Sequence, residues 1–183
     1  MSGTRLPRRR FLQVAATGAA AGAAVSCGHR QNRWRSLTES EATTLAAVCD
    51  QIIPPDDAPG ATQAGALEFI DGQLAGRYRR YRTAYSDGLR SLDAIATRTG
   101  GQPFAKLTGA QQFELLSRLD EGKLGSGADY DAARTFFNLA VAHTMQGFYG
   151  TPRHGGNREA ASWVMLGVPV RPVRSRTSPE LKS

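Results

Sequence analysis

The stretch LTESEATTLAAVCDQIIPP, residues 37–55, contains a helix start, a helical repeat of apolar residues and a helix stop. Thr38 followed three residues later by Glu41 is a capping box, in which each side chain accepts a hydrogen bond from the other residue's backbone N–H. Pro54 and Pro55 cannot continue a helix, because proline lacks the N–H and its ring clashes with the preceding turn. The stretch therefore predicts a helix that begins after Thr38 and stops at Pro54. One face of this helix carries Leu45, Val48, Cys49, Ile52 and Ile53.

The helical repeat continues after the Pro-rich loop that follows. Helical spacing of apolar residues resumes at Leu67 and runs to Gly100. A second capping box, Thr108 with Gln111, opens another helix, and a longer helix follows over residues 129–147. The predicted core stripes are Leu67, Ile70, Leu74, Tyr78, Tyr81, Tyr85, Leu89, Leu92 and Ile95, then Phe113, Leu115, Leu116 and Leu119, and last Tyr130, Phe137, Val141 and Phe148. No alternating strand pattern of useful length is present, so the sequence predicts an all-α fold.

The positive charge of the chain is concentrated at its ends. The formal net charge is +7, and residues 1–36 hold seven Arg and no acid. Residues 37–170 hold twelve Lys and Arg against fifteen Asp and Glu. A nucleic-acid site needs cations gathered on the folded surface. We therefore expect no nucleic acid as a partner, and we interpret Tyr78–Arg82, YRRYR, as core-facing tyrosines with a solvated basic flank.

The N-terminus has the features of an export signal. The segment PRRRFLQVAATGAAAGAAVSCG has a basic start, a weakly apolar Ala/Gly-rich stretch and small residues before Cys27. Arg8 and Arg9 followed by Phe11 and Leu12 resemble the twin-arginine signal, which carries folded cargo. The segment is too short and too rich in Gly and Ala for a stable membrane span. We expect export by the twin-arginine translocase to the periplasm or cell envelope.

Cys27 has two alternative interpretations. Residues 24–27, AVSC, resemble a lipobox with Ala24 where leucine is usual, so Cys27 is a candidate lipidation site. The alternative is ordinary cleavage after an alanine such as Ala23. Either outcome leaves Cys49 without a disulfide partner, and its apolar surroundings predict a buried small hydrophobic residue. The predicted organisation is a signal at 1–27, a basic linker at 28–36, a single compact helical domain at 37–170 with an irregular Gly/Pro-rich C-terminal region, and a flexible basic tail at 171–183.

Motifs that hold cofactors or carry out catalysis are missing from the sequence. Gly-rich phosphate loops, C-x-x-C pairs, C-x-x-C-H, H-E-x-x-H and G-x-S-x-G do not occur. The three histidines are His29, His143 and His154, and the first lies in the predicted linker, so two remain for the folded domain. We therefore predict no catalytic, cofactor-binding or metal-binding residues in this chain.

The C-terminal stretch HTMQGFYGTPRHGGNREAASWVMLGVP, residues 143–169, is dense in glycine, aromatic and basic residues. Its pattern H-T-x-x-G-F-Y-G-x-P-R-x-G-G-N-R, followed by W-x-x-x-G-x-P, resembles the C-terminal signature of the gluconate 2-dehydrogenase subunit 3 family. The segment IIPPDDAPGA at residues 52–61 and the leader are also similar to that family. The matching signature residues are His143, Thr144, Gly147, Phe148, Tyr149, Gly150, Pro152, Arg153, Gly155, Gly156, Asn157, Arg158, Trp163, Gly167 and Pro169.

The resemblance implies a small, cofactor-free subunit of a periplasmic or membrane-attached dehydrogenase. Its partner would be a large FAD-containing subunit of the glucose-methanol-choline type, often joined by a multihaem cytochrome c subunit. The large subunit of that family commonly lacks an export signal, so the small subunit would carry one signal for both. Substrates of such complexes include sugars, sugar acids and alcohols.

The signature stretch itself predicts a turn region that contacts this partner. Gly147–Gly150 can end the long helix in a left-handed turn, and Asn157 is a good N-cap for a short helix through Met165. Exposed aromatic and Arg side chains are typical interface anchors. The predicted interface residues are His143, Phe148, Tyr149, Arg153, Asn157, Arg158 and Trp163. His143 and Trp163 could instead be packing residues of the core, and two other functions stay open: a stand-alone lipoprotein that binds a small molecule, and a minor hydrolase.

Overall fold

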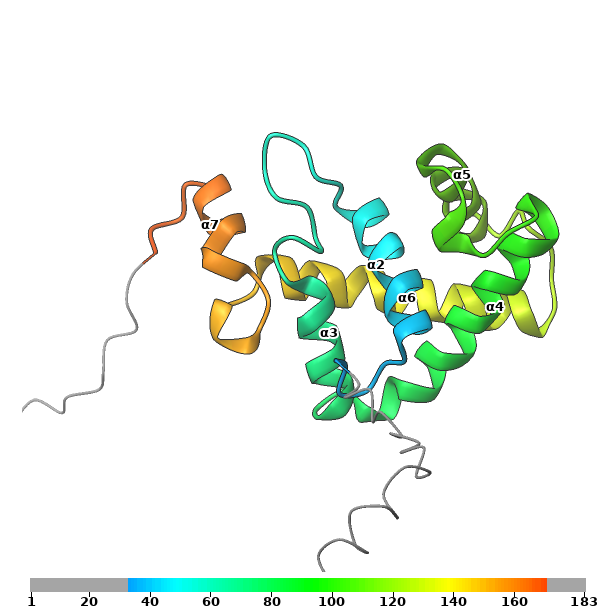
Figure 1. The fold of residues 1–183 in the computed structure, drawn as a ribbon, viewed down its shortest axis with the longest axis horizontal. Coiled ribbons are helices and arrows are strands. Elements are labelled where there is room, and N and C mark those ends of the chain that lie inside the picture. The colour runs from blue at the N-terminus through cyan, green and yellow to red at the C-terminus, as the bar shows by residue number, and fades with distance from the viewer. Residues whose placement is uncertain (1–32, 171–183) are drawn as a thin grey trace, which may run out of the picture. The chain divides into compact units, whose positions relative to one another are not determined.

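The capping box at Thr38 is formed as predicted. In the computed structural model, which describes residues 33–170, Glu41 N–H donates to Thr38 Oγ1 at 3.2 Å and Thr38 N–H donates to Glu41 Oε2 at 2.8 Å. Helix α2, Glu39–Ile52, follows this cap (Figure 1). The predicted export signal, Cys27 and the tail lie outside the described residues.

Helices account for all the regular secondary structure between residues 33 and 170, which confirms the all-α prediction. After α2 the elements are α3 (Ala66–Ala75), η1 (Arg79–Tyr81), α4 (Arg82–Gly100), η2 (Phe104–Lys106), α5 (Gly109–Asp120), α6 (Ala128–Tyr149), η3 (Pro152–His154), η4 (Arg158–Ala160) and α7 (Ala161–Met165). The second capping box, Thr108 with Gln111, is formed at the start of α5. No helix of this part of the chain combines the length and the apolar character needed to cross a bilayer.

The predicted continuous helical run from Leu67 to Ile95 is wrong, because the backbone breaks between α3 and α4. Gly76 leaves helical geometry at φ −124° and ψ −109°, and the short η1 turn follows before α4 begins. The apolar spacing continues across this break because Tyr78, Tyr81 and Tyr85 face one common target, the ring of His143. A shared core contact therefore produced the regular spacing that we interpreted as one helix.

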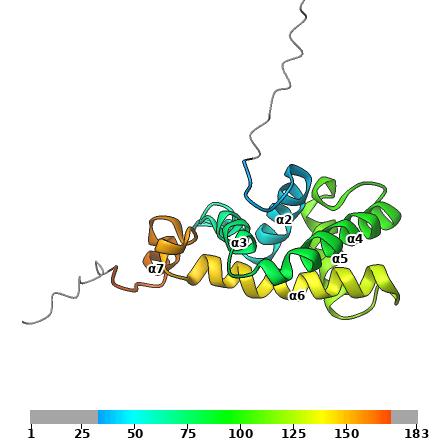
Figure 2. The ribbon, with the colours of Figure 1, turned by 90° about the horizontal axis from the view of Figure 1, so that it is seen from below.

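Helix α6 is the element against which the others pack. Figure 2 shows it running below α3, α2, α5 and α4. α4 approaches it closely at Gly88, where a Cβ would lie only 2.0 Å from Phe136 Cβ. A side chain at this position would separate the two helices, so glycine is required at the crossing.

The buried face of α6 agrees with the predicted one at Phe148 and differs at the other three residues. Phe136 is fully buried, whereas Phe137, Val141 and Tyr130 are only half-buried. The inner face consists of Ala133, Phe136, Ala140, His143, Thr144, Gly147 and Phe148. On α5, Phe113 is also an exception, since it is 63% exposed. Phe136 and Phe137 are adjacent, and the apolar residues of α6 do not follow one helical period, so the sequence did not show which phenylalanine faces the core.

The chain entering α2 is tied to α3. The buried carboxylate of Asp71 accepts hydrogen bonds from the backbone N–H groups of Arg35, Ser36 and Leu37 at 2.8, 2.8 and 3.0 Å. Trp34 is buried beside this contact. Residues 33–36, which the sequence placed in a linker, therefore pack on the helical domain.

Candidate functional site

The signature glycines allow backbones to approach closely at the end of α6. A Cβ on Gly147 would lie 3.0 Å from Ala66 Cα of α3. A Cβ on Gly156 would lie 2.2 Å from the carbonyl oxygen of Gly147. Contacts of this kind leave no room for a side chain. These glycines therefore hold the returning chain, residues 150–158, against α3 and α6.

Asn157 closes this returning chain from inside. The side chain is fully buried, its Nδ2 donates to the Gly150 carbonyl at 2.8 Å and its Oδ1 accepts from Ser162 N–H at 3.0 Å. The residue adjoining α7 is Ala160, and no side chain caps the helix there. Asn157 holds the N-cap position of η4 as predicted, but its side chain does not cap that turn and instead satisfies an amide in the first turn of α7, five residues away.

The backbone around Asn157 is strained. Asn157, Glu159 and Ala160 have φ values of 44°, 56° and 57°, in the left-handed region that non-glycine residues enter at a cost of about 1–2 kcal/mol each. Arg158 holds the segment in place, since its N–H donates to the Ala64 carbonyl at 2.8 Å and its guanidinium lies 3.5 Å from Glu68 Oε1. Strain of this kind persists only where surrounding contacts fix the conformation.

The end of α6 also differs from the predicted left-handed turn. Gly150 has φ −71° and ψ 178°, which is extended backbone. A Cβ there would lie 2.3 Å from the Gln146 carbonyl oxygen, so close approach rather than left-handed geometry is the reason for this glycine. The signature glycines that end a helix in left-handed geometry are Gly155, at φ 94° after η3, and Gly167, at φ 65° after α7.

His143 lies inside the fold. Its Nδ1 is 2.9 Å from the Tyr85 hydroxyl, and its ring stacks on Tyr78 with the centroids 4.4 Å apart. Burial lowers the pKa of His143 below its ordinary value, because desolvation disfavours the charged imidazolium. The side chain therefore acts as a neutral link that joins α6 to α4 and to the turn before η1.

The seven predicted interface residues fall into two groups. His143, Phe148 and Asn157 are buried, so none of them offers a side chain to a partner in this conformation. The other four reach the surface: Tyr149, Arg153, Arg158 and, half-buried, Trp163. The indole N–H of Trp163 donates to the Tyr149 carbonyl at 3.0 Å, which fixes the ring against the end of α6.

The sequence prediction omitted the apolar residues that are most exposed in this region. They follow Trp163 in the run VMLGVPV, and the exposed members are Val164, Met165, Leu166, Val168 and Val170. Val164 is 66% exposed and Leu166 58% exposed. The hydrophobic run was visible in the sequence, but only the fold shows that this chain does not cover it within residues 33–170.

A pocket of about 420 Å³ lies beside the same loop. Its lining residues are Phe69, Gln73, Arg77, Tyr78, Gln146, Gly150, Thr151 and His154. The Tyr78 hydroxyl donates to Gln146 Oε1, which joins the turn before η1 to α6 at the pocket wall. None of the lining residues is acidic, and Arg77 and His154 are basic.

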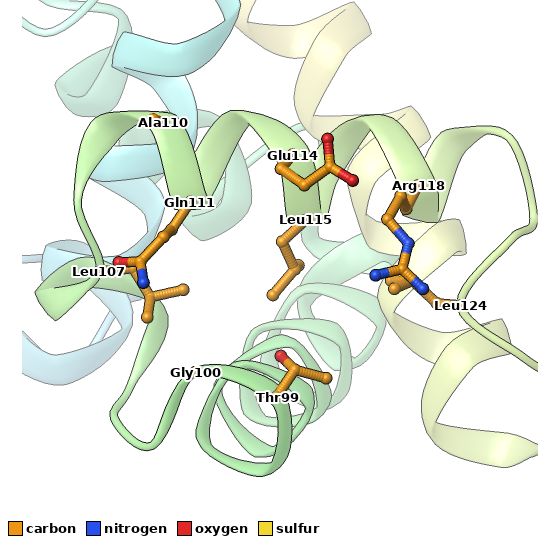
Figure 3. Close-up of a pocket in the computed structure, with 9 residues that line it drawn as sticks. All are labelled: Thr99, Gly100, Leu107, Ala110, Gln111, Glu114, Leu115, Arg118 and Leu124. Carbon is orange, nitrogen blue, oxygen red and sulfur yellow. The ribbon is translucent and has the colours of Figure 1, made fainter.

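A second groove, of about 330 Å³, lies between the end of α4 and α5 (Figure 3). Leu107, Leu115 and Leu124 line its apolar side, and Glu114 and Arg118 provide opposite charges. No signature residue lines this groove. In the described part of the chain, no three His, Cys, Asp or Glu side chains gather to form a metal site.

Comparison with known proteins identifies the family. No curated protein and no solved structure matches the chain. The family model for gluconate 2-dehydrogenase subunit 3 matches residues 39–169, which covers α2 to α7 and the whole region around Asn157. The chain therefore belongs to the gluconate 2-dehydrogenase subunit 3 family, a family of subunits of a dehydrogenase complex.

Proposed function

We propose that this chain is a non-catalytic small subunit of a membrane-associated, FAD-dependent dehydrogenase of the glucose-methanol-choline type. The complex oxidises a sugar, a sugar acid or an alcohol. The small subunit supports export, maturation and assembly of the flavoprotein subunit. In this proposal FAD, and haem c where a cytochrome subunit is present, belong to the partners. Membership in a family of dehydrogenase subunits supports the need for a catalytic partner.

The observation that carries the proposal is the exposed apolar surface at the C-terminal end of the domain. Five apolar residues between Val164 and Val170 are exposed, and Tyr149 is 38% exposed next to Trp163. Single exposed apolar residues are common on soluble proteins, but a concentration of them marks an interaction site. The strained and hydrogen-bonded segment at Asn157 supports this surface, so the surface is held in a defined position rather than collapsed on the core.

Two side chains that could serve as a nucleophile or a base, Cys49 and His143, are used for packing, which supports a non-catalytic role. Cys49 is fully buried beside Thr144, and burial raises its pKa to about 12. Its thiolate, the form that acts as a nucleophile, is therefore disfavoured. His143 is buried and engaged by Tyr85, as described above.

The export part of the proposal rests on the sequence. Arg8, Arg9, Phe11 and Leu12 match a twin-arginine signal, and the twin-arginine translocase accepts folded complexes. A flavoprotein that folds around FAD in the cytoplasm could cross the membrane bound to this chain. The location would be periplasmic or cell-envelope, with or without a lipid on Cys27.

The test is purification of the full chain, tagged after Ser183, from the envelope fraction of its own cells. We expect a co-purifying large subunit with about one FAD per small subunit and with dye-reducing activity on a sugar, sugar acid or alcohol. The same chain expressed alone should show neither flavin absorbance nor activity. Stoichiometric FAD in the isolated chain, or a chain recovered without any flavoprotein, would contradict the proposal.

Export is tested separately. Arg8→Lys combined with Arg9→Lys should retain both this chain and the flavoprotein in the cytoplasm. Recovery of the flavoprotein outside in normal amount would show that the small subunit is not its carrier.

A further inference from the structure

The pocket beside Arg77 and His154 combines an apolar wall with a positive edge. The rings of Phe69 and Tyr78 provide apolar surface, and Gln73, Gln146 and Thr151 provide polar groups around it. Its volume of about 420 Å³ lies in the range of pockets that receive ligands or partner side chains. The pocket can therefore take a bulky apolar side chain with a polar neighbour.

The charge of the surrounding surface favours an acidic occupant. Arg77, Arg79 and Arg80 are exposed in the turn between α3 and α4. The side chains of Arg77 and Arg79 form no ion pair or hydrogen bond with other described residues, whereas the side chain of Arg82 in the same run is already paired with Glu41 at 2.8 Å. This positive surface contrasts with the acidic excess of residues 37–170. Unpaired arginines at the edge of a pocket complement a carboxylate.

One loop connects the pocket to the proposed subunit interface. Gly150, Thr151 and His154 line the pocket, and the same loop leads through Asn157 to Trp163 and the exposed apolar residues after it. The Asn157 side chain bonds the Gly150 carbonyl directly. The position of the pocket wall is therefore coupled to the same segment that holds the apolar surface.

We propose that this pocket receives an acidic segment of the flavoprotein subunit. A bulky apolar side chain of that segment enters between Phe69 and Tyr78, and an adjacent carboxylate pairs with Arg77. The inference rests on the proposed function, since it names the chemistry by which the large subunit is recognised. The pocket and the apolar surface at residues 164–170 then form two parts of one interface.

The experiment measures the affinity of the purified flavoprotein subunit for variants of the full chain. Arg77→Glu reverses the charge at the pocket edge, and Gln73→Trp fills the pocket without changing charge. Each should weaken binding by about tenfold, which corresponds to the loss of one good contact. Lys106→Glu and Gln102→Trp make the same changes at exposed positions that do not line the pocket, and should bind as the wild type does.

Further measurements separate the outcomes. Rising salt should weaken wild-type binding more than binding of Arg77→Glu, because salt screens exposed charges. Unchanged melting curves of the isolated variants show that the losses are not due to misfolding. Wild-type affinity in both pocket variants would overturn this inference and leave the proposed function intact, whereas a wild-type chain that binds no flavoprotein would overturn both. Arg77-dependent binding to phosphatidylglycerol vesicles, with unchanged flavoprotein affinity, would assign the positive surface to a membrane instead and also overturn the inference.

Discussion

Replacing Asn157 with alanine should release the C-terminal segment from the domain. The substitution removes the part-buried bond to the Gly150 carbonyl, at a cost of about 1 kcal/mol. It also leaves the buried Ser162 N–H without its acceptor, which costs about 1–3 kcal/mol. Alanine at φ 44° adds about 1 kcal/mol of strain. The segment should therefore lose about 3–5 kcal/mol of local stability.

The loss should be local rather than global, because residues 150–170 can detach while α2 to α6 stay packed. The assay is hydrogen exchange of the Arg158 amide, which donates to the Ala64 carbonyl and keeps this partner in the variant. Its protection should fall by about 100-fold or more, since each 1.4 kcal/mol is a factor of ten. The melting temperature of the isolated chain should change little, and affinity for the proposed flavoprotein partner should fall with the protection.

Two variants serve as controls for this experiment. Asn157→Gly loses the same two hydrogen bonds, but glycine adopts the left-handed backbone without strain. The local stability measured at the Arg158 amide should therefore fall by about 1 kcal/mol less than in the alanine variant. Asn138→Ala changes an exposed asparagine on α6 and should leave exchange at Arg158 unchanged. Wild-type protection of Arg158 in Asn157→Ala would refute the reasoning that Asn157 holds the segment.

Three further predictions concern the core. Gly88→Ala should destabilise the isolated chain by about 1–3 kcal/mol in thermal unfolding, because the new Cβ would meet Phe136 at 2.0 Å, whereas Gly72→Ala, with nothing within 4 Å in α3, should stabilise it by about 0.5–1 kcal/mol. Cys49 should not react with a thiol reagent until the chain unfolds. Burial raises the pKa of its thiol from 9.0 to about 12, so the unfolded chain loses this proton at lower pH than the folded chain does, and the free energy of unfolding should fall as pH rises from 9 towards 12. Burial lowers the pKa of His143 below 6.5, so the unfolded chain binds a proton there more readily than the folded chain, and the free energy of unfolding should fall as pH drops below 6.5. In a pH series of melting curves, His143→Gln should lose less stability than the wild type over this acid range. An equal loss in both proteins would assign the effect to other groups.

The helix starts were predictable from the sequence because the interactions that define them are local. Thr38 with Glu41 and Thr108 with Gln111 are three residues apart, and both capping boxes are formed in the structure. Pro54 likewise ends α2 by a local effect, because proline lacks the backbone N–H and its ring clashes with the preceding turn in any helix. The all-α class and the burial of Cys49 follow from the same short-range patterns.

Where the chain bends depended on contacts between distant residues. Tyr78 and Tyr81 lie in the break between α3 and α4, and they keep a helical spacing with Tyr85 of α4 because each of the three contacts His143, more than fifty residues later in the chain. Phe136 rather than Phe137 faces the core because Gly88 of α4 approaches α6 closely at Phe136. The spacing of apolar residues in α6 alone does not reveal this contact.

At the candidate site, the signature residues show the same difference between what local sequence predicts and what distant contacts decide. Their types and order identify the family, so the sequence by itself determined the class of protein to which this chain belongs. Only the tertiary structure decided that Asn157 and His143 face inward, and that Arg77 from the turn after α3 shares a pocket with His154 from the loop after α6. The physical reason is that capping and proline effects act within a few residues of backbone, whereas burial and pocket formation depend on which segments the packed helices bring together.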